Sequence, residues 1–277
     1  MSRRPVLVLH GGTGSHPTRK RLLQIRESLR AICEEAYSYL QSHCASETAV
    51  FAVRRLEDDP LFNAGTGSML QQDGKVRMSA SVMDGSRMRF AAVLNIERVK
   101  NPIVVAQALL DEADRVLAGA EATRFARSLG FASWNPVTPA RLRRWRRAYG
   151  TVGALALDYD GRLAAATSTG GRGFERAGRV SDSGMPVGNY ADEQLAISCT
   201  GIGEEIIDEG LAIRIAQRIQ DGATLQHVFA RTFRELKARR RSVGAIGLDR
   251  DGRFAWVTTL PVLFAVTKTT TRLIASC

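Results

Sequence analysis

The chain of 277 residues has only four cysteines, which form no C-x-x-C pair and no zinc-type spacing with the four histidines. A disulfide framework is therefore not expected, and this cysteine usage suits a reducing compartment. No apolar run approaches the roughly eighteen residues of a membrane helix, and the run after Arg4 is too short for a signal-peptide core. We expect a cytoplasmic protein with no membrane segment.

The common catalytic motifs are also missing. The sequence has no G-x-x-x-x-G-K-[ST] phosphate loop, no G-x-G-x-x-G turn, no H-E-x-x-H zinc motif and no G-x-S-x-G elbow. His10-Gly11-Gly12 is similar to the oxyanion loop of esterases, but without a serine elbow that interpretation fails. These absences argue against nucleotide-binding, zinc-peptidase and serine-hydrolase functions.

Positive charge is in excess, with a net charge of +11. It gathers in RLRRWRR at 141–147 and KARRR at 237–241. The first run contains one tryptophan, Trp145, and the second contains no aromatic residue, so neither has the series of interleaved aromatic residues of a stacking platform; neither belongs to a nucleic-acid-binding module. We interpret both runs as solvated surface and expect no specific nucleic acid partner, although weak adhesion to polyanions stays open.

The length and the 44% hydrophobic content suit one domain over residues 1–277. Hydrophobic periodicity and turn residues predict its elements. In the first half of the chain the predicted elements are a strand over 6–9 leading into a glycine turn at 11–14, helices over 19–43 and 46–56, and strands within 62–90 joined by an Asp73-Gly74 turn. After these we predict a helix over 101–129, an exposed connector or frayed helix over 131–148, and a helical stretch over 203–240.

An internal sequence repeat indicates the fold class. VGALALDYDGRLAAAT at 152–167 and VGAIGLDRDGRFAWVT at 243–258 match at ten of sixteen positions. Each has two apolar strands around an Asp-Gly turn, which indicates a hairpin. Hairpins with helices grouped between them favour antiparallel sheets covered by helices. We predict an α+β fold, layered α-β-β-α with largely antiparallel sheets, with a three-layer arrangement as the alternative.

Threonine and glycine dominate the remaining polar positions. Thr151 begins an apolar strand directly after Gly150 and the arginine-rich connector. A threonine that becomes a chain terminus can use its own α-amino group as base, since the pKa of such a group is about 7.7–8.0. This chemistry needs a cut between Gly150 and Thr151. The alternative is an ordinary strand-forming threonine.

Two further groups could serve such a nucleophile. Thr200-Gly201 lies at a strand-to-helix junction, where a hydroxyl and a backbone N–H can stabilise an oxyanion; a plain helix cap is the alternative. Arg179 and Asp182 lie three residues apart in a glycine-flanked loop. They match the carboxylate and ammonium of an amino acid, with a surface salt bridge as the alternative.

Taken together, LHGGTG, LFNAGTGS, SASVMDG, GTVGALALDYDGRLAAATSTGG, GRVSDS and CTGIGE resemble the plant-type L-asparaginase / isoaspartyl peptidase family over nearly the whole chain. The resemblance implies an N-terminal-nucleophile (Ntn) hydrolase in a four-layer α-β-β-α sandwich. It implies self-cleavage into an α subunit, 1–150, and a β subunit, 151–277, which pair into an (αβ)₂ homodimer. The implied substrates are L-asparagine and isoaspartyl dipeptides, with no cofactor required.

The resemblance also implies a role for each site residue. Thr151 would be the nucleophile, Thr169 would orient it, and Thr200 with Gly201 would form the oxyanion hole. The implied substrate-binding residues are Arg179, Asp182, Thr200, Gly201 and Gly203, and the residues implied to line the site are Gly11, Gly12 and Asn63. The loop of Leu61, Phe62, Asn63, Ala64 and Gly65 resembles the family's structural sodium loop. A glycosylasparaginase-like or threonine endopeptidase activity, or a non-catalytic polyanion-binding relative, are the alternatives.

Overall fold

The computed structural model describes residues 4–14, 18–143 and 150–276. In these residues the strands are β1 (Val6–Gly14), β2 (Met78–Asp84), β3 (Arg89–Ile96), β4 (Val116–Ala118), β5 (Val152–Leu157), β6 (Leu163–Thr169), β7 (Asn189–Ala191), β8 (Leu195–Gly201), β9 (Val243–Asp249), β10 (Phe254–Thr258), β11 (Val262–Thr269) and β12 (Leu273–Ala275). The helices are α1 (Arg19–Leu40), α2 (Ala45–Asp58), α3 (Pro102–Ala108), α4 (Gly119–Ser128), α5 (Pro139–Arg143), α6 (Gly203–Glu209), α7 (Leu211–Gln220) and α8 (Leu225–Ala238), with 3₁₀ turns η1 (Leu109–Asp111) and η2 (Asp182–Gly184).

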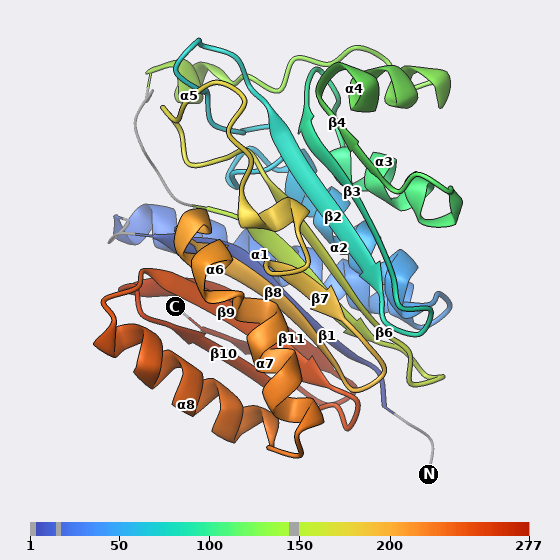
Figure 1. Ribbon diagram of the computed structural model, residues 1–277, viewed down its shortest axis with the longest axis vertical. Helices are drawn as coiled ribbons and strands as arrows, with labels where there is room; N and C mark the ends of the chain where they lie inside the picture. Colours follow the sequence, from blue (N-terminus) through green and yellow to red (C-terminus); the bar gives the residue numbers. More distant parts are fainter. Residues whose placement is uncertain (1–3, 15–17, 144–149, 277) are drawn as a thin grey trace.

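The strands form two sheets, as the α+β prediction requires. The larger has the order β12-β11-β1-β5-β6-β2-β3-β4, and the smaller has the order β10-β9-β8-β7. Their strand pairs are antiparallel except for β3 with β4. Helices α1 to α4 pack against the larger sheet, whereas α7 and α8 pack against the smaller one (Figure 1).

Apolar side chains fill the space between the sheets, where β5 and β6 contact β8. This core contains Val8, Leu155, Ala165, Ala196 and Ile246, all fully buried. Because successive strand side chains point to opposite faces, the other faces of β1, β5 and β6 pack under α1 and α2. The central strands are therefore buried on both faces, which explains their nearly continuous apolar sequences.

Both predicted hairpins are confirmed. β5 pairs with β6 and β9 pairs with β10, each across the predicted Asp-Gly turn. The helices expected over 19–43 and 46–56 are present as α1 and α2, and the stretch over 203–240 contains α6, α7 and α8. Helix α1 begins after Thr18, whose hydroxyl accepts a hydrogen bond from the Arg21 N–H, as an N-cap should.

Three predicted elements were wrong in detail. Residues 61–77 form a loop, and the turn joining β2 to β3 lies at 85–88 instead of Asp73-Gly74. The helix over 101–129 is interrupted, because β4 pairs in parallel with β3. The first strand runs on through the predicted glycine turn, with an irregularity in pairing between His10 and Thr13.

Within the connector at 131–148, residues 139–143 form α5 and the residues before them are irregular; 144–148 lie outside the described residues. No helix in the described part of the chain has the length and apolar character that crossing a membrane requires. Cys33, Cys44 and Cys199 are free thiols.

Candidate active site

Thr151 lies at the start of β5, beside the end of β6. The pairing of Val152 with Ser168 brings the neighbouring Thr151 and Thr169 together. The Thr151 hydroxyl donates to Thr169 Oγ1 at 3.4 Å and lies 3.5 Å from Ser183 Oγ. Thr151 is 6% exposed, so its hydroxyl is almost fully enclosed. The structure thus brings together Thr151 and Thr169 as predicted and adds Ser183, which had no assigned role.

The carbonyl group of Gly150 is held by two donors. Asn63 Nδ2 donates to Gly150 O at 2.7 Å, and Thr169 Oγ1 donates to the same oxygen at 3.3 Å. Asn63 Nδ2 also donates to Gly171 O, while its Oδ1 accepts from the Met69 N–H at 3.0 Å. These bonds fix the amide orientation of Asn63. The carbonyl of the expected cleavage site is therefore polarised next to the Thr151 hydroxyl.

Gly12 packs directly against the peptide between Gly150 and Thr151. Its φ is +99°, and a Cβ atom there would lie 3.0 Å from Gly150 Cα and 3.2 Å from Thr151 N. Any other residue would push this peptide aside or strain the backbone. Gly11 faces the loop instead, where a Cβ would lie 2.6 Å from a ring carbon of Phe62. Of the two glycines expected to line the site, Gly12 alone packs against the peptide between Gly150 and Thr151.

Thr200 and Gly201 end strand β8 in the second sheet. The Thr200 hydroxyl is fully buried and has no hydrogen-bond partner among the described residues. A buried hydroxyl without a partner is costly, which indicates a group kept for a transient ligand. Gly201 has a φ of +129° and lines the same cavity as Thr151. This arrangement suits the predicted oxyanion hole.

Arg179 has a partner that the sequence analysis missed. Its Nε and Nη2 atoms each lie 2.9 Å from a carboxylate oxygen of Glu204, in a bidentate pair. The edge of the guanidinium that carries Nη1 is left for a ligand. The signal in the sequence was the place of Glu204 at the end of the CTGIGE segment, three residues after Gly201.

Asp182 lies in the same cavity but makes no side-chain salt bridge to Arg179. Burial raises the pKa of Asp182 to about 7, against the opposing charge of Arg179, and its Oδ2 has no hydrogen-bond partner within the described chain. A Cβ on Gly203 would lie 2.7 Å from Asp182 Oδ1 and 2.8 Å from Arg179 Nη2. Gly203 therefore keeps open the space between an anionic and a cationic group, as a zwitterionic ligand requires.

A buried chain of hydrogen bonds links the two sheets beneath the site. It joins His10 Nε2 to Ser198 Oγ at 2.8 Å, Ser198 to Thr167 at 2.7 Å, Thr167 to Asn189 at 2.9 Å, Asn189 to Ser81 at 3.0 Å, and Ser81 to the Ser183 carbonyl at 2.7 Å. Burial lowers the pKa of His10 to about 3, so this histidine is neutral at physiological pH. The chain holds Ser183 in place next to Thr151.

The cavity at this site is narrow in the uncut chain, with a volume of about 10 Å³, which holds about one water molecule. It is lined by Gly150, Thr151, Thr169, Gly171, Arg172, Arg179, Ser181, Asp182, Gly201 and Gly203. Six of the predicted site residues thus line one cavity together with Gly150. Gly171, Arg172 and Ser181 were not predicted.

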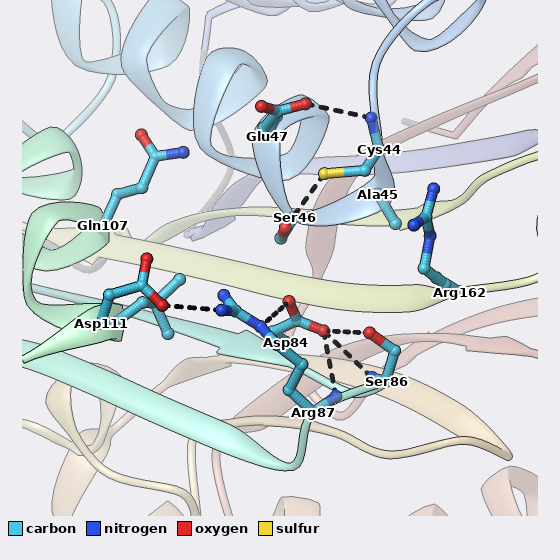
Figure 2. Close-up of a pocket in the computed structure, with 11 residues that line it drawn as sticks. Cys44, Ala45, Ser46, Glu47, Asp84, Ser86, Arg87, Gln107, Asp111 and Arg162 are labelled. Atoms are coloured by element: carbon cyan, nitrogen blue, oxygen red, sulfur yellow. Dashed lines mark hydrogen bonds and ion pairs between the residues drawn. The ribbon is translucent and has the colours of Figure 1, made fainter.

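A larger hollow, of about 410 Å³, lies at the other end of β2, β5 and β6 (Figure 2). Its arginines are already paired: Arg87 with Asp84 at 2.8 Å and with Asp111 at 2.7 Å, and Arg162 with Asp158 at 2.9 Å. The Cys44 thiol lies 3.3 Å from the Ser46 hydroxyl. This hollow therefore offers no set of unpaired reactive groups.

The loop at 61–65 fits a sodium ion poorly. Leu61 O accepts from Arg21 at 2.6 Å, and Phe62 O accepts from Arg141 at 3.1 Å. The Asn63 carbonyl accepts from the Gly170 N–H at 2.9 Å and the Gly65 carbonyl accepts from the Ser68 N–H at 3.3 Å. Two guanidinium groups would repel a cation at these oxygens. A sodium ion here stays a prediction.

Glu57 joins the segment after this loop to strand β6. Its backbone carbonyl accepts from the Thr66 N–H at 2.7 Å, and its Oε1 accepts from Ser168 Oγ at 2.6 Å and from the Ile103 N–H at 3.1 Å. Complete burial raises the pKa of the Glu57 carboxyl to about 8. At neutral pH this side chain is therefore largely protonated.

The second arginine run has structural partners. Arg239 and Arg241 bind the buried carboxylate of Glu209 at 2.7 and 3.0 Å, and Arg214 binds it as well. In the first run Arg141 binds the loop carbonyls, while residues 144–147 lie outside the described residues. The arginines named here hold the fold together instead of forming a free basic surface.

Comparison with known proteins places these features in context. A family model described as Asparaginase matches residues 3–149 and 146–275. The isoaspartyl peptidase/L-asparaginase of Nostoc sp. is 46% identical, over 94% of this chain and 91% of its own length. The enzyme of the same name from Synechocystis sp. is 42% identical, over 96% and 88%. The plant-type L-asparaginase of Thermococcus kodakarensis is 36% identical, over 79% and 81%.

Proposed function

The chain belongs to the asparaginase family, and from that premise we propose that it is a self-cleaving amidohydrolase acting on L-asparagine and β-aspartyl dipeptides through Thr151. The names of the relatives supply the substrate class. The observation that carries the assignment of the nucleophile is the Thr151 hydroxyl, enclosed between Thr169 and Ser183 beside a carbonyl held by Asn63.

Maturation begins when Thr151 Oγ1 attacks the carbonyl carbon of Gly150. The peptide C–N bond breaks, an ester to the threonine oxygen forms, and the nitrogen takes up a proton to become the new α-amino group. Water then hydrolyses the ester. Asn63 stabilises the negative charge that develops on the Gly150 oxygen. The products are an α subunit, 1–150, and a β subunit, 151–277.

In the mature enzyme Thr151 supplies both the nucleophile and the base. Its hydroxyl attacks the side-chain amide carbon of the substrate while its α-amino group accepts the proton. Ammonia or an amino acid leaves with that proton, and water releases aspartate from the acyl-enzyme. Thr200 and Gly201 donate to the oxyanion, which gives the partnerless Thr200 hydroxyl its ligand.

Arg179 and Asp182 fix the α-carbon end of the substrate. The α-carboxylate binds the free edge of Arg179, which Glu204 holds in position from the other side. The α-ammonium pairs with Asp182 Oδ1, the carboxylate oxygen that faces the space beside Gly203. Gly203 leaves the room that both groups need.

We extend the proposal to the assembly. Helices on the outer sides of two packed sheets favour the four-layer α-β-β-α sandwich of an Ntn hydrolase over the three-layer alternative. We further propose an (αβ)₂ homodimer in the cytoplasm, with no cofactor required.

Purified protein run on a denaturing gel tests this function directly. Wild-type protein should resolve into pieces 1–150 and 151–277, the second beginning with Thr-Val-Gly-Ala, and should release ammonia from L-asparagine. Thr151→Ala should remain full length and inactive, whereas Thr151→Ser should still cleave. Full-length wild-type protein without amidase activity would falsify the proposal.

The rival functions have less support. The relatives are named isoaspartyl peptidase/L-asparaginase and plant-type L-asparaginase, which favours a small amino acid or dipeptide over the glycosylated asparagine or protein substrate of the glycosylasparaginase-like and endopeptidase alternatives. A polyanion-binding role is weakened because Arg239 and Arg241 are paired with Glu209.

A further inference from the structure

The cavity contains a second guanidinium group, that of Arg172, for which the hydrolysis of asparagine has no use. Arg172 follows Gly171 in the segment after β6, and both residues line the cavity with Thr151. Asparagine has a single carboxylate, and Arg179 binds it in the proposed function. The cavity therefore has one cation more than asparagine requires.

The guanidinium of Arg172 is poorly satisfied. Its closest recorded ion pair is 3.5 Å from Nη1 to Glu204 Oε2, an oxygen that Arg179 Nη2 already binds at 2.9 Å. The Nε atom of Arg172 is buried and has no hydrogen-bond partner among the described residues. An arginine presents five N–H donors in a fixed plane, so the one long ion pair found for Arg172 leaves donors without a partner among the described residues.

Arg172 is a neighbour of Arg179 but comes from another segment. Both arginines contact Glu204 Oε2, while Arg179 faces Asp182 across Gly203 and Arg172 directly follows Gly171. A substrate whose α-carbon end is fixed at Arg179 and Asp182 must extend its other end past Thr151, which attacks it. In a β-aspartyl dipeptide that other end is the leaving amino acid, which has a carboxylate of its own.

We propose that Arg172 binds the carboxylate of the leaving amino acid and so favours β-aspartyl dipeptides over asparagine, an inference that rests on the proposed function. Guanidinium and carboxylate form a charge-assisted, planar pair. Because an ammonia leaving group has no carboxylate, Arg172 contributes to dipeptide turnover alone.

Three substrates measured with the matured enzyme test this role: L-asparagine, β-Asp-Leu and β-Asp-leucinamide. The last two differ only in the leaving group's carboxylate. Arg172→Gln should lower kcat/KM for β-Asp-Leu about tenfold, mainly through KM, since it removes one charge-assisted pair. The kcat/KM values of Arg172→Gln for asparagine and for β-Asp-leucinamide should stay within about twofold of the wild-type values. Arg172→Lys should restore part of the loss because it keeps the charge.

The matched control is Arg176→Gln, an exposed arginine in the same segment, which should leave all three values unchanged. Equal losses on all three substrates, or no loss on β-Asp-Leu, would overturn the role of Arg172 while leaving the proposed function intact. Wild-type enzyme that hydrolyses none of the three would instead overturn the proposed function, and the role of Arg172 with it.

Discussion

The side-chain amide of Asn63 donates a hydrogen bond of 2.7 Å to the carbonyl oxygen of Gly150. One residue in a loop after α2 is thereby joined to the bond whose cleavage the mechanism requires, 87 positions later in the chain. The two donors at this oxygen differ in length, since Thr169 lies at 3.3 Å. In the proposed maturation step Asn63 would therefore be the main donor to the oxyanion.

Replacing Asn63 with alanine should slow self-cleavage about a hundredfold, because the oxyanion loses its shorter donor. The measurement is the disappearance of full-length chain on denaturing gels over time after purification. Asn135→Ala, an exposed asparagine in the connector, is the control and should mature like wild type. Unchanged cleavage of Asn63→Ala would remove Asn63 from the maturation mechanism.

Thr200→Val should separate activity from stability. Loss of an oxyanion donor lowers kcat about a hundredfold. The free energy of unfolding should stay the same or rise, because the buried Thr200 hydroxyl has no partner to lose. Thr232→Val is the opposite control: its buried hydroxyl accepts from Arg218 at 2.7 Å, so it should lose about 1 kcal/mol of stability and keep its kcat. A large loss of stability in Thr200→Val would mean that its hydroxyl serves the fold.

The pH dependence of kcat/KM should reveal Asp182. Burial raises its pKa to about 7, so below that pH the carboxyl is neutral and cannot pair with the substrate's ammonium. The α-amino group of Thr151 must also lose a proton, with an ordinary pKa of about 7.7–8.0. As the pH is lowered from 6 to 5, the logarithm of kcat/KM for asparagine should therefore fall by about two. In Asp182→Asn, kcat/KM for asparagine should be lower at every pH, and the slope of its logarithm against pH should fall to about one. An unchanged slope would show that Asp182 does not titrate in the free enzyme.

Glu57 should make the folded chain less stable as the pH rises. Its folded pKa is about 8, against about 4.3 in an unfolded chain, so between these values the unfolded state binds fewer protons. The free energy of unfolding therefore falls with rising pH by up to about 1.4 kcal/mol per pH unit from this group, and its contribution is fully present below pH 4.3. Glu57→Gln should flatten that slope, measured by denaturant unfolding of uncut Thr151→Ala protein at pH 5 to 8. The exposed Glu112→Gln should leave it as it is, and equal slopes in both variants would refute the titration of Glu57.

Local patterns predicted what local interactions determine. The hairpin of β5 and β6 was recognised because its apolar strands and the turn closed by the Gly161 N–H to Asp158 are adjacent in sequence. The loop at 61–77 was mistaken for strands, since its shape depends on distant partners such as Pro136, which accepts from the Gly67 N–H. Strand β4 was missed for the same reason, because it exists only through its pairing with β3.

The site followed the same rule. Thr151, Thr169, Arg179 and Asp182 could be named from short motifs, and the structure places them in one cavity. The supporting contacts could not be predicted, because they join residues far apart: His10 and Ser198 are 188 positions apart, and Ser81 and Ser183 are 102 apart. Tertiary packing determines which polar residues face each other across the two sheets. Neither hydrophobic periodicity nor turn residues carry information about that packing.

The order of strands in the larger sheet has a consequence for the cut protein. Strand β1 lies between β11 and β5, and β2 lies beside β6, so pieces 1–150 and 151–277 alternate across one sheet. Breaking the bond at Gly150 disrupts none of these ladders, yet neither piece alone contains the complete larger sheet, whereas the smaller sheet lies wholly within piece 151–277. The two products should consequently stay associated without a covalent bond and unfold together in one cooperative transition. After separation in denaturant, each piece should refold only when the other is present.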